Sequence, residues 1–148
     1  MRGGDDMELN VEPWIIDYSY KLCPKKIIQE EVNEEIENIV TIVNKQLNKR
    51  KSDKFVSIIK DKNSVQFPSK QLDITIGYNV NKEQNKLSMP VYDNLETMKF
   101  SDSIEITCFS KEYQVKGTVL LRNVDKSYES LKEAINYAIS EILKNKTR

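Results

Sequence analysis

The segment KKIIQEEVNEEIENIVTIVNKQLN, residues Lys25–Asn48, decides the fold because it carries an uninterrupted helical pattern. Its apolar residues recur at steps of three and four, so at about 100° per residue they form one stripe. Acidic side chains crowd the first half and basic side chains the end, which suits the helix dipole. We therefore predict an amphipathic helix that starts close to Pro24. The stripe consists of Ile28, Val32, Ile36, Ile39, Val40, Val43 and Leu47.

A second amphipathic helix is predicted toward the C-terminal end. It would begin near Asp125 or Ser127, because either side chain can cap a helix. Its apolar stripe consists of Tyr128, Leu131, Ile135, Ala138, Ile139 and Ile142, with Ala134 and Leu143 at the margins.

The residues between the two helices alternate between apolar and polar in the manner of β-strands. Pro90 cannot donate a ladder hydrogen bond, so its segment is predicted to be an edge strand. Gly117 indicates a bulge or the close approach of a helix. The predicted strands are Lys54–Lys60, Ser64–Phe67, Leu72–Asn79, Leu87–Tyr92, Ser103–Phe109 and Tyr113–Arg122.

Two further segments complete the chain. Val11–Lys21 alternates large and polar side chains after Pro13 and is predicted to be the first strand. The polar stretch Asn81–Lys86 is predicted to be a mobile loop. The whole pattern indicates an α+β fold, in which an antiparallel sheet of about five to seven strands carries two amphipathic helices packed on one face. We expect one domain over residues 11–148, preceded by a flexible leader over residues 1–10.

Composition excludes several classes of protein. Lysine plus arginine number 23 and aspartate plus glutamate number 23, so the net charge is zero and no global attraction to nucleic acid is expected. No apolar run is long enough to span a bilayer, and no secretory signal is evident. Cys23 and Cys108 are the only cysteines, and we expect both to be reduced thiols in a cytoplasmic protein without membrane contact.

The chain has no histidine, which removes the usual catalytic triads, the common zinc sites and histidine general bases. No glycine-rich phosphate cradle is present, and we expect neither a metal nor a cofactor. Asp73 and Glu105 are candidates for a pair of catalytic carboxylates. The alternation of apolar and polar residues in their strands already explains both as side chains on the solvent face of the sheet. Cys108 aligns with apolar neighbours, and Cys23 near a predicted helix start is at most modestly activated.

We therefore predict a non-enzymatic protein-binding module of the immunity, antitoxin, chaperone or phage-inhibitor type. The acidic helix face contains like-charged pairs four residues apart, which destabilise an isolated helix and favour a partner with a basic surface. Tyr137 lies opposite the apolar stripe of its helix and resembles an interface anchor flanked by acids. The predicted binding residues are Glu30, Glu34, Glu37, Glu133, Tyr137 and Glu141.

Two alternatives remain open. A nucleic-acid or ribosome-associated protein would use the basic residues Lys45, Lys49, Arg50 and Lys51. A small apolar-ligand binder would enclose a cavity between the sheet and the last helix. That cavity would be lined by Trp14, Tyr18, Phe67, Tyr78 and Tyr113.

Overall fold

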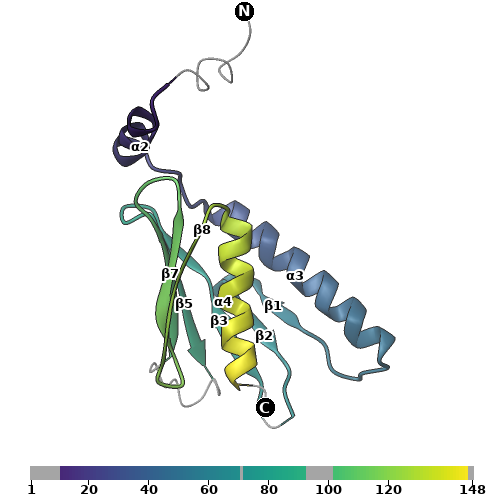
Figure 1. Ribbon diagram of the computed structural model, residues 1–148. Helices are drawn as coiled ribbons and strands as arrows, with labels where there is room; N and C mark the ends of the chain where they lie inside the picture. Colours follow the sequence, from purple (N-terminus) through teal and green to yellow (C-terminus); the bar gives the residue numbers. More distant parts are fainter. Residues whose placement is uncertain (1–10, 71, 93–101, 147–148) are drawn as a thin grey trace, which may run out of the picture.

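The computed structural model describes residues 11–70, 72–92 and 102–146, in which helices pack against an antiparallel sheet as predicted. Helix α4 (Leu131–Lys146) lies across one face of the sheet, and helix α3 (Gln29–Lys49) runs beside it and diverges from it (Figure 1). The leader predicted over residues 1–10 lies outside the described residues. None of the described helices is long and apolar enough to cross a lipid bilayer.

The sheet is antiparallel throughout, in the order β1-β2-β3-β5-β6-β7-β8, with β4 paired to β5. A short 3₁₀ turn, Lys60–Lys62, separates the first two strands. The strands are β1 (Ser57–Ile59), β2 (Ser64–Phe67), β3 (Ile74–Gly77), β4 (Asn79–Asn81), β5 (Lys86–Tyr92), β6 (Ser103–Cys108), β7 (Tyr113–Val119) and β8 (Arg122–Tyr128).

The core lies between the helices and one face of the sheet. Strands β5 and β6 bury every second side chain, as their alternation predicts. Helix α3 buries Val32, Ile36 and Ile39 of the predicted stripe. Helix α4 contributes Leu131, Ala134, Ile135, Ala138, Ile139 and Ile142 to the same buried cluster.

The start of α3 differs from the prediction. Pro24 lies in the connection before the helix, and the first helical residue is Gln29. Ile27 is buried in that connection, whereas Ile28 precedes the helix and is 41% exposed. An extended connection points successive side chains to opposite sides, so only one of the two isoleucines reaches the core.

The prediction of a strand over Val11–Lys21 is wrong, because this segment forms helix α2 (Pro13–Leu22). Pro13 occupies the first turn, where its fixed φ favours a helix and its missing N–H costs nothing. The segment fits the two-residue period of a strand and also the period of a helix, since Trp14, Tyr18 and Leu22 recur every four residues. Ile15, which interrupts the alternation, is the residue that could have indicated a helix.

The prediction of an edge strand at Leu87–Tyr92 is also wrong, because β5 is central and pairs with β3, β4 and β6. Along one edge of β5, the pairing with β4 ends at Ser88 and the pairing with β3 begins at Val91. Pro90 lies in the gap between these two pairings. A Cβ built on Gly77 would lie 3.0 Å from the Pro90 ring, so the ring occupies this gap. No ladder hydrogen bond is needed there, and proline is tolerated.

The predicted helix start at Asp125 or Ser127 is wrong, since both residues lie in β8. Strand β7 ends earlier than predicted, and Leu120 and Leu121 form a turn with positive φ before β8. The Ser130 hydroxyl instead accepts a hydrogen bond from the Glu133 N–H at the start of α4. The spacing of this serine and glutamate matches a capping box and was a usable signal.

Gly117 allows two strands to approach closely, and the predicted bulge is wrong because pairing with both neighbouring strands is continuous. It lies opposite Ile104 in continuous pairing between β6 and β7. A Cβ built on Gly117 would lie 2.2 Å from the Ser103 carbonyl oxygen, which belongs to the backbone of the neighbouring strand. No side-chain rotation can relieve that contact.

We predict that Gly117→Ala lowers the free energy of unfolding by roughly 1–3 kcal/mol, because the sheet must shift to admit the methyl group. The urea midpoint, with an unchanged slope, measures the loss. Gly77→Ala is the matched control and is expected to cost less, since its closest neighbour is the Pro90 side chain at 3.0 Å. Wild-type stability of Gly117→Ala would contradict the packing described here.

Candidate functional site

Side-chain amides attach α3 to the sheet at both of its ends. Near the first turn, the Gln29 amide donates to the Tyr78 carbonyl at 3.0 Å and accepts from the Val80 N–H at 2.9 Å. Near the last turns, the Asn44 amide donates to the Val56 carbonyl at 3.0 Å and accepts from the Val56 N–H at 2.7 Å. Each amide pairs with backbone groups as a neighbouring strand would, so the orientation of α3 is defined.

A third amide attaches the connection before α3 to the sheet. Asn85 is buried, has a φ of 50° and lies in the tight turn between β4 and β5, where a mobile loop was predicted. Its Oδ1 accepts from the Ile27 N–H at 2.8 Å. Its Nδ2 donates to the carbonyls of Lys25 at 2.7 Å and Cys108 at 2.9 Å. We refer to Gln29, Asn44 and Asn85 as the amide clamps.

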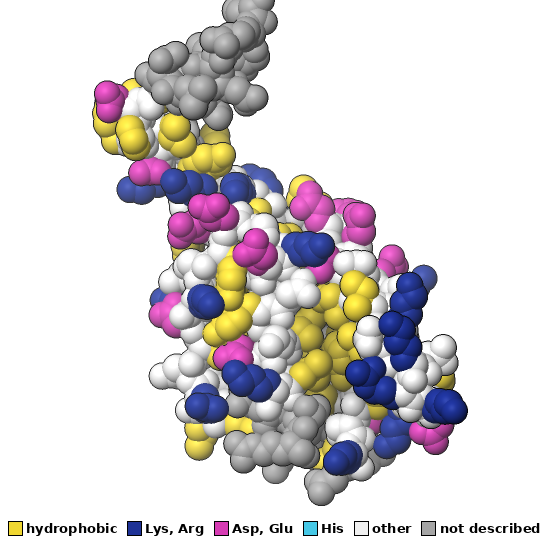
Figure 2. Space-filling view, turned by 45° about the vertical axis from the view of Figure 1, so that its right-hand side comes forward, with side chains coloured by type: hydrophobic (Ala, Val, Ile, Leu, Met, Phe, Trp, Pro, Cys, Tyr) yellow, Lys and Arg dark blue, Asp and Glu magenta, His cyan; other side chains and the backbone are white. Residues whose placement is uncertain are grey.

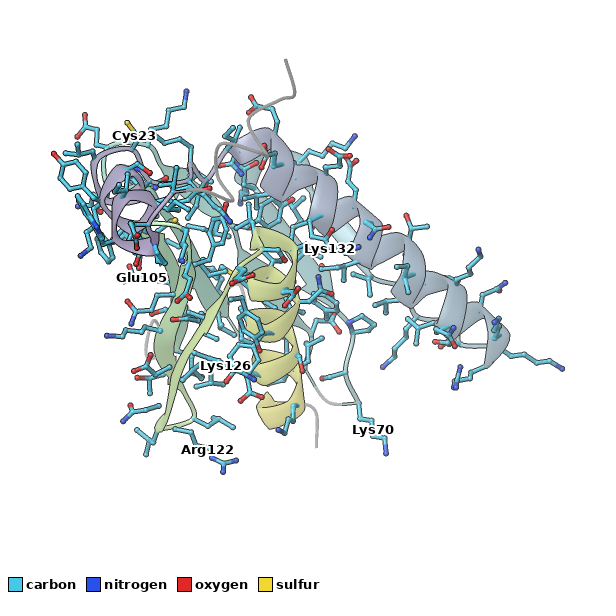
Figure 3. All side chains as sticks on the ribbon, turned by 45° about the horizontal axis from the view of Figure 1, so that its top comes forward. Cys23, Lys70, Glu105, Arg122, Lys126 and Lys132 are labelled. Atoms are coloured by element: carbon cyan, nitrogen blue, oxygen red, sulfur yellow. The ribbon has the colours of Figure 1, made fainter. Side chains whose placement is uncertain are left out.

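The clamps position an acidic depression between α3 and the start of α4. Its volume is about 550 Å³, and it is open to solvent. Lys132 projects from α4 toward α3 and is the one cationic lining residue among the described residues (Figure 3). The lining residues are Glu31, Glu34, Glu35, Glu37, Asn38, Thr41, Leu131 and Lys132.

The carboxylates of this depression are not neutralised within the described part of the chain. Glu35 accepts a hydrogen bond from the Asn136 amide at 2.7 Å, which joins α3 to α4. Neither Glu34 nor Glu37 forms a salt bridge with a described residue. Each pair of like-charged residues four positions apart, such as Glu31 and Glu35, destabilises a helix by about 0.2–0.5 kcal/mol.

The structure separates the predicted binding residues. Glu34 and Glu37 line the depression, whereas Glu30 is exposed and is not one of its lining residues. Tyr137 and Glu141 lie on the other flank of α4, over β8, and Glu133 is exposed at the outer side of α4. Figure 3 shows Lys132 and Lys126 on opposite sides of α4. The six predicted residues therefore do not form one surface.

Tyr137 is packed rather than fully exposed as predicted. Its ring centroid lies 5.4 Å from that of Tyr128 in β8. The Lys126 amine lies 5.3 Å from the Tyr137 centroid, and the phenol donates to Glu141 at 3.4 Å. Burial, followed by the charge of Glu141, raises the pKa of Tyr137. Its contacts are accounted for within the fold, so it is a poor anchor for a partner.

The predicted basic residues gather at the far end of α3 from the acidic depression (Figure 2). Lys45, Lys49 and Lys51 are exposed. Arg50 is held by Gln46, whose carbonyl and side-chain oxygens accept from the guanidinium at 3.2 and 3.0 Å. Helix α3 is consequently acidic at one end and basic at the other.

The catalytic candidates have ordinary structural surroundings. Asp73 accepts from the Gln66 amide, and Glu105 pairs with Lys86 at 3.0 Å. Burial raises the pKa of the Cys108 thiol, which disfavours the nucleophilic thiolate. Among the described residues, no cluster of three acidic or thiol side chains could hold a metal ion.

The aromatic set proposed for an apolar cavity is not brought together. Phe67, Tyr78 and Tyr113 are buried core residues. Trp14 and Tyr18 are instead exposed on α2, at 66% and 57%. The strand predicted over Val11–Lys21 gives no indication of this exposed helical face.

No family model matches the chain, and no curated protein or solved structure is detectably similar to it.

We predict that Asn85→Ala lowers the free energy of unfolding by about 3 kcal/mol or more, because one N–H and two carbonyls lose their partner. Asn85→Asp keeps the acceptor for Ile27 but loses both donors, and is expected to be nearly as unstable. Asn81→Ala, in the same hairpin but exposed, is the matched control. Urea unfolding measures all three, and a loss below about 1 kcal/mol for Asn85→Ala would refute the role of this clamp.

The two thiols should differ sharply in reactivity. Cys23 is exposed, whereas Cys108 is buried with a raised pKa and donates to the Ser110 carbonyl. We expect Ellman's reagent to modify one thiol rapidly in the folded protein and the second only after unfolding. Cys23→Ser should abolish the rapid phase. Rapid modification of two thiols in the folded wild type would be inconsistent with the buried position of Cys108.

Proposed function

We propose that the chain is a non-enzymatic protein-binding module whose acidic depression receives a basic segment of another protein. The observation that supports this most directly is that, of the residues that the structure describes, four glutamates and a single lysine line one open depression. Folding gains little from this arrangement, because like charges on one helix repel. A lysine or arginine from a partner would relieve that repulsion.

The chemistry of the depression defines the partner. Charge-assisted hydrogen bonds from a guanidinium to Glu34 or Glu37 are stronger than neutral ones. Exposed charges act mainly on specificity and association rate, so the complex should weaken as salt rises. Immunity proteins, antitoxins, chaperones and phage-encoded inhibitors are roles of this kind. We also propose a cytoplasmic location, since Cys23 and Cys108 are both free thiols.

Nucleic-acid or ribosome binding is the second candidate, supported by the exposed cations at the end of α3. Phosphate backbones attract such a group, and their affinity falls steeply with salt. The acidic half of the same helix and the zero net charge oppose that attraction. We therefore rank it below protein binding.

We predict that charge reversal in the depression, Glu34→Lys with Glu37→Lys, abolishes capture of a specific protein from an extract of the native host. The reversal replaces attraction of a basic segment by repulsion. The matched control, Glu30→Lys with Glu133→Lys, makes the same change in net charge outside the depression and should retain the partner. Capture at low and moderate salt, followed by mass spectrometry, is the measurement.

Each outcome of this experiment is informative. Loss of one protein from the depression variant alone would support the proposal. Equal retention by both variants, or recovery of nucleic acid that Arg50→Glu abolishes, would contradict it. Failure of the wild type to retain any specific protein would also count against it.

A further inference from the structure

Helix α2 presents an apolar face that the rest of the described chain does not cover. None of its ten residues is buried. Trp14, Ile15, Tyr18 and Leu22 are 66%, 40%, 57% and 66% exposed. At about 100° per residue these four side chains fall within an arc of roughly 100°. The half-buried Ile16 lies on the opposite side, so the exposed arc points away from the sheet.

The orientation of α2 is set by contacts at its base. Asp17 pairs with Lys111 at 3.1 Å. The Lys25 N–H donates to the Ser110 carbonyl at 2.9 Å, and the Lys25 amine donates to the Glu129 carbonyl at 3.0 Å. The helix therefore stands at one end of the sheet with its outer face in solvent (Figures 1 and 2).

The exposed face is large for a monomer of this size. Aromatic side chains have about 150–250 Å² of surface each, so the four residues leave roughly 400 Å² of apolar area in water. Monomeric proteins rarely expose a contiguous apolar patch of more than a few hundred Å². A helix that is apolar on this face is expected to bury it against a partner.

The charges beside the apolar arc identify that partner. Asp17 and Lys21 lie on one flank of the arc, next to Trp14 and four residues apart along the helix. If two α2 helices pack antiparallel about a two-fold axis at Tyr18, Asp17 of each copy lies on the same flank as Lys21 of the other and about 3 Å from it along the helix axis, within reach of the lysine side chain. The flank is thus complementary to itself under a two-fold rotation, as a symmetric dimer requires.

We propose that α2 is a homodimerisation helix that packs antiparallel against α2 of a second copy of this chain. Trp14 of one copy lies against Leu22 of the other, and the two Tyr18 rings meet at the two-fold axis. The buried area totals about 1,000 Å² at most, which is the lower limit for a specific interface. The dimer is therefore weak and forms in proportion to protein concentration.

The single tryptophan of the chain makes the interface directly observable. Sedimentation equilibrium of the full chain should show a monomer–dimer equilibrium in the micromolar range. Trp14 fluorescence should shift to shorter wavelength over the same concentrations, because the indole leaves water. A monomer at every concentration, or a dimer without any change in Trp14 emission, would overturn the proposal.

Variants separate this interface from non-specific association. Tyr18→Ser should raise the dimer dissociation constant at least about tenfold, the loss typical of an interface anchor. Leu121→Ser, which removes a 94% exposed side chain from the β7–β8 turn, is the matched control and should leave it unchanged. Circular dichroism verifies that both variants remain folded.

Charge exchange tests the antiparallel geometry. Lys21→Asp places an acid of each copy beside Asp17 of the other on the shared flank and should weaken the dimer. Adding Asp17→Lys together with Lys111→Glu reverses both charges of the flank, keeps the intramolecular pair at the base of α2 in reversed form, and should restore the dimer. Absence of restoration, or equal dimerisation of all variants, would rule out the antiparallel arrangement.

Discussion

The attachment of α3 to the sheet depends on three side-chain amides that bind backbone groups. A primary amide has a donor and an acceptor, so it can satisfy a neighbouring segment as a strand would. Gln29 and Asn44 do this at the two ends of α3, and Asn85 does it for the connection before the helix. Apolar contacts alone are non-directional and would allow α3 to rotate or slide. The clamps remove that freedom, and with it they determine which glutamates face α4.

The two long helices and most strands can be predicted from the sequence, because their apolar period is unambiguous and the chain is long enough to bury a core. Prediction from local pattern fails where a segment fits both the helical and the strand period. It also fails where contacts with a distant element determine the structure of a segment. Helix α2 reads equally well as a strand, and Pro90 lies in a central strand only because its neighbours change there. The end of β7 escapes prediction too, since Leu120 and Leu121 adopt positive φ without glycine or asparagine.

The sequence predicts the acidic charge of the candidate site, but it does not predict which residues form the site. The acidic half of α3 is evident in the sequence, yet only the packing of α4 shows that Glu34 and Glu37 line a depression and that Tyr137 does not. Position on a helix gives the direction of a side chain relative to its own axis. It does not give the neighbour on each flank, which depends on pairing between segments about a hundred residues apart, such as Glu35 and Asn136. The outer face of α2 was hidden for the same reason.

Amide hydrogen exchange measured residue by residue tests the clamps most directly. The N–H groups of Ile27 and Val56 lie outside every helix and strand, and Val80 N–H points to α3 rather than to β5. Their protection therefore depends on side-chain amides alone. These three N–H groups are expected to exchange as slowly as those of the central strands β5 and β6. Exchange as fast as in the exposed turns would show that α3 is not held in the way described.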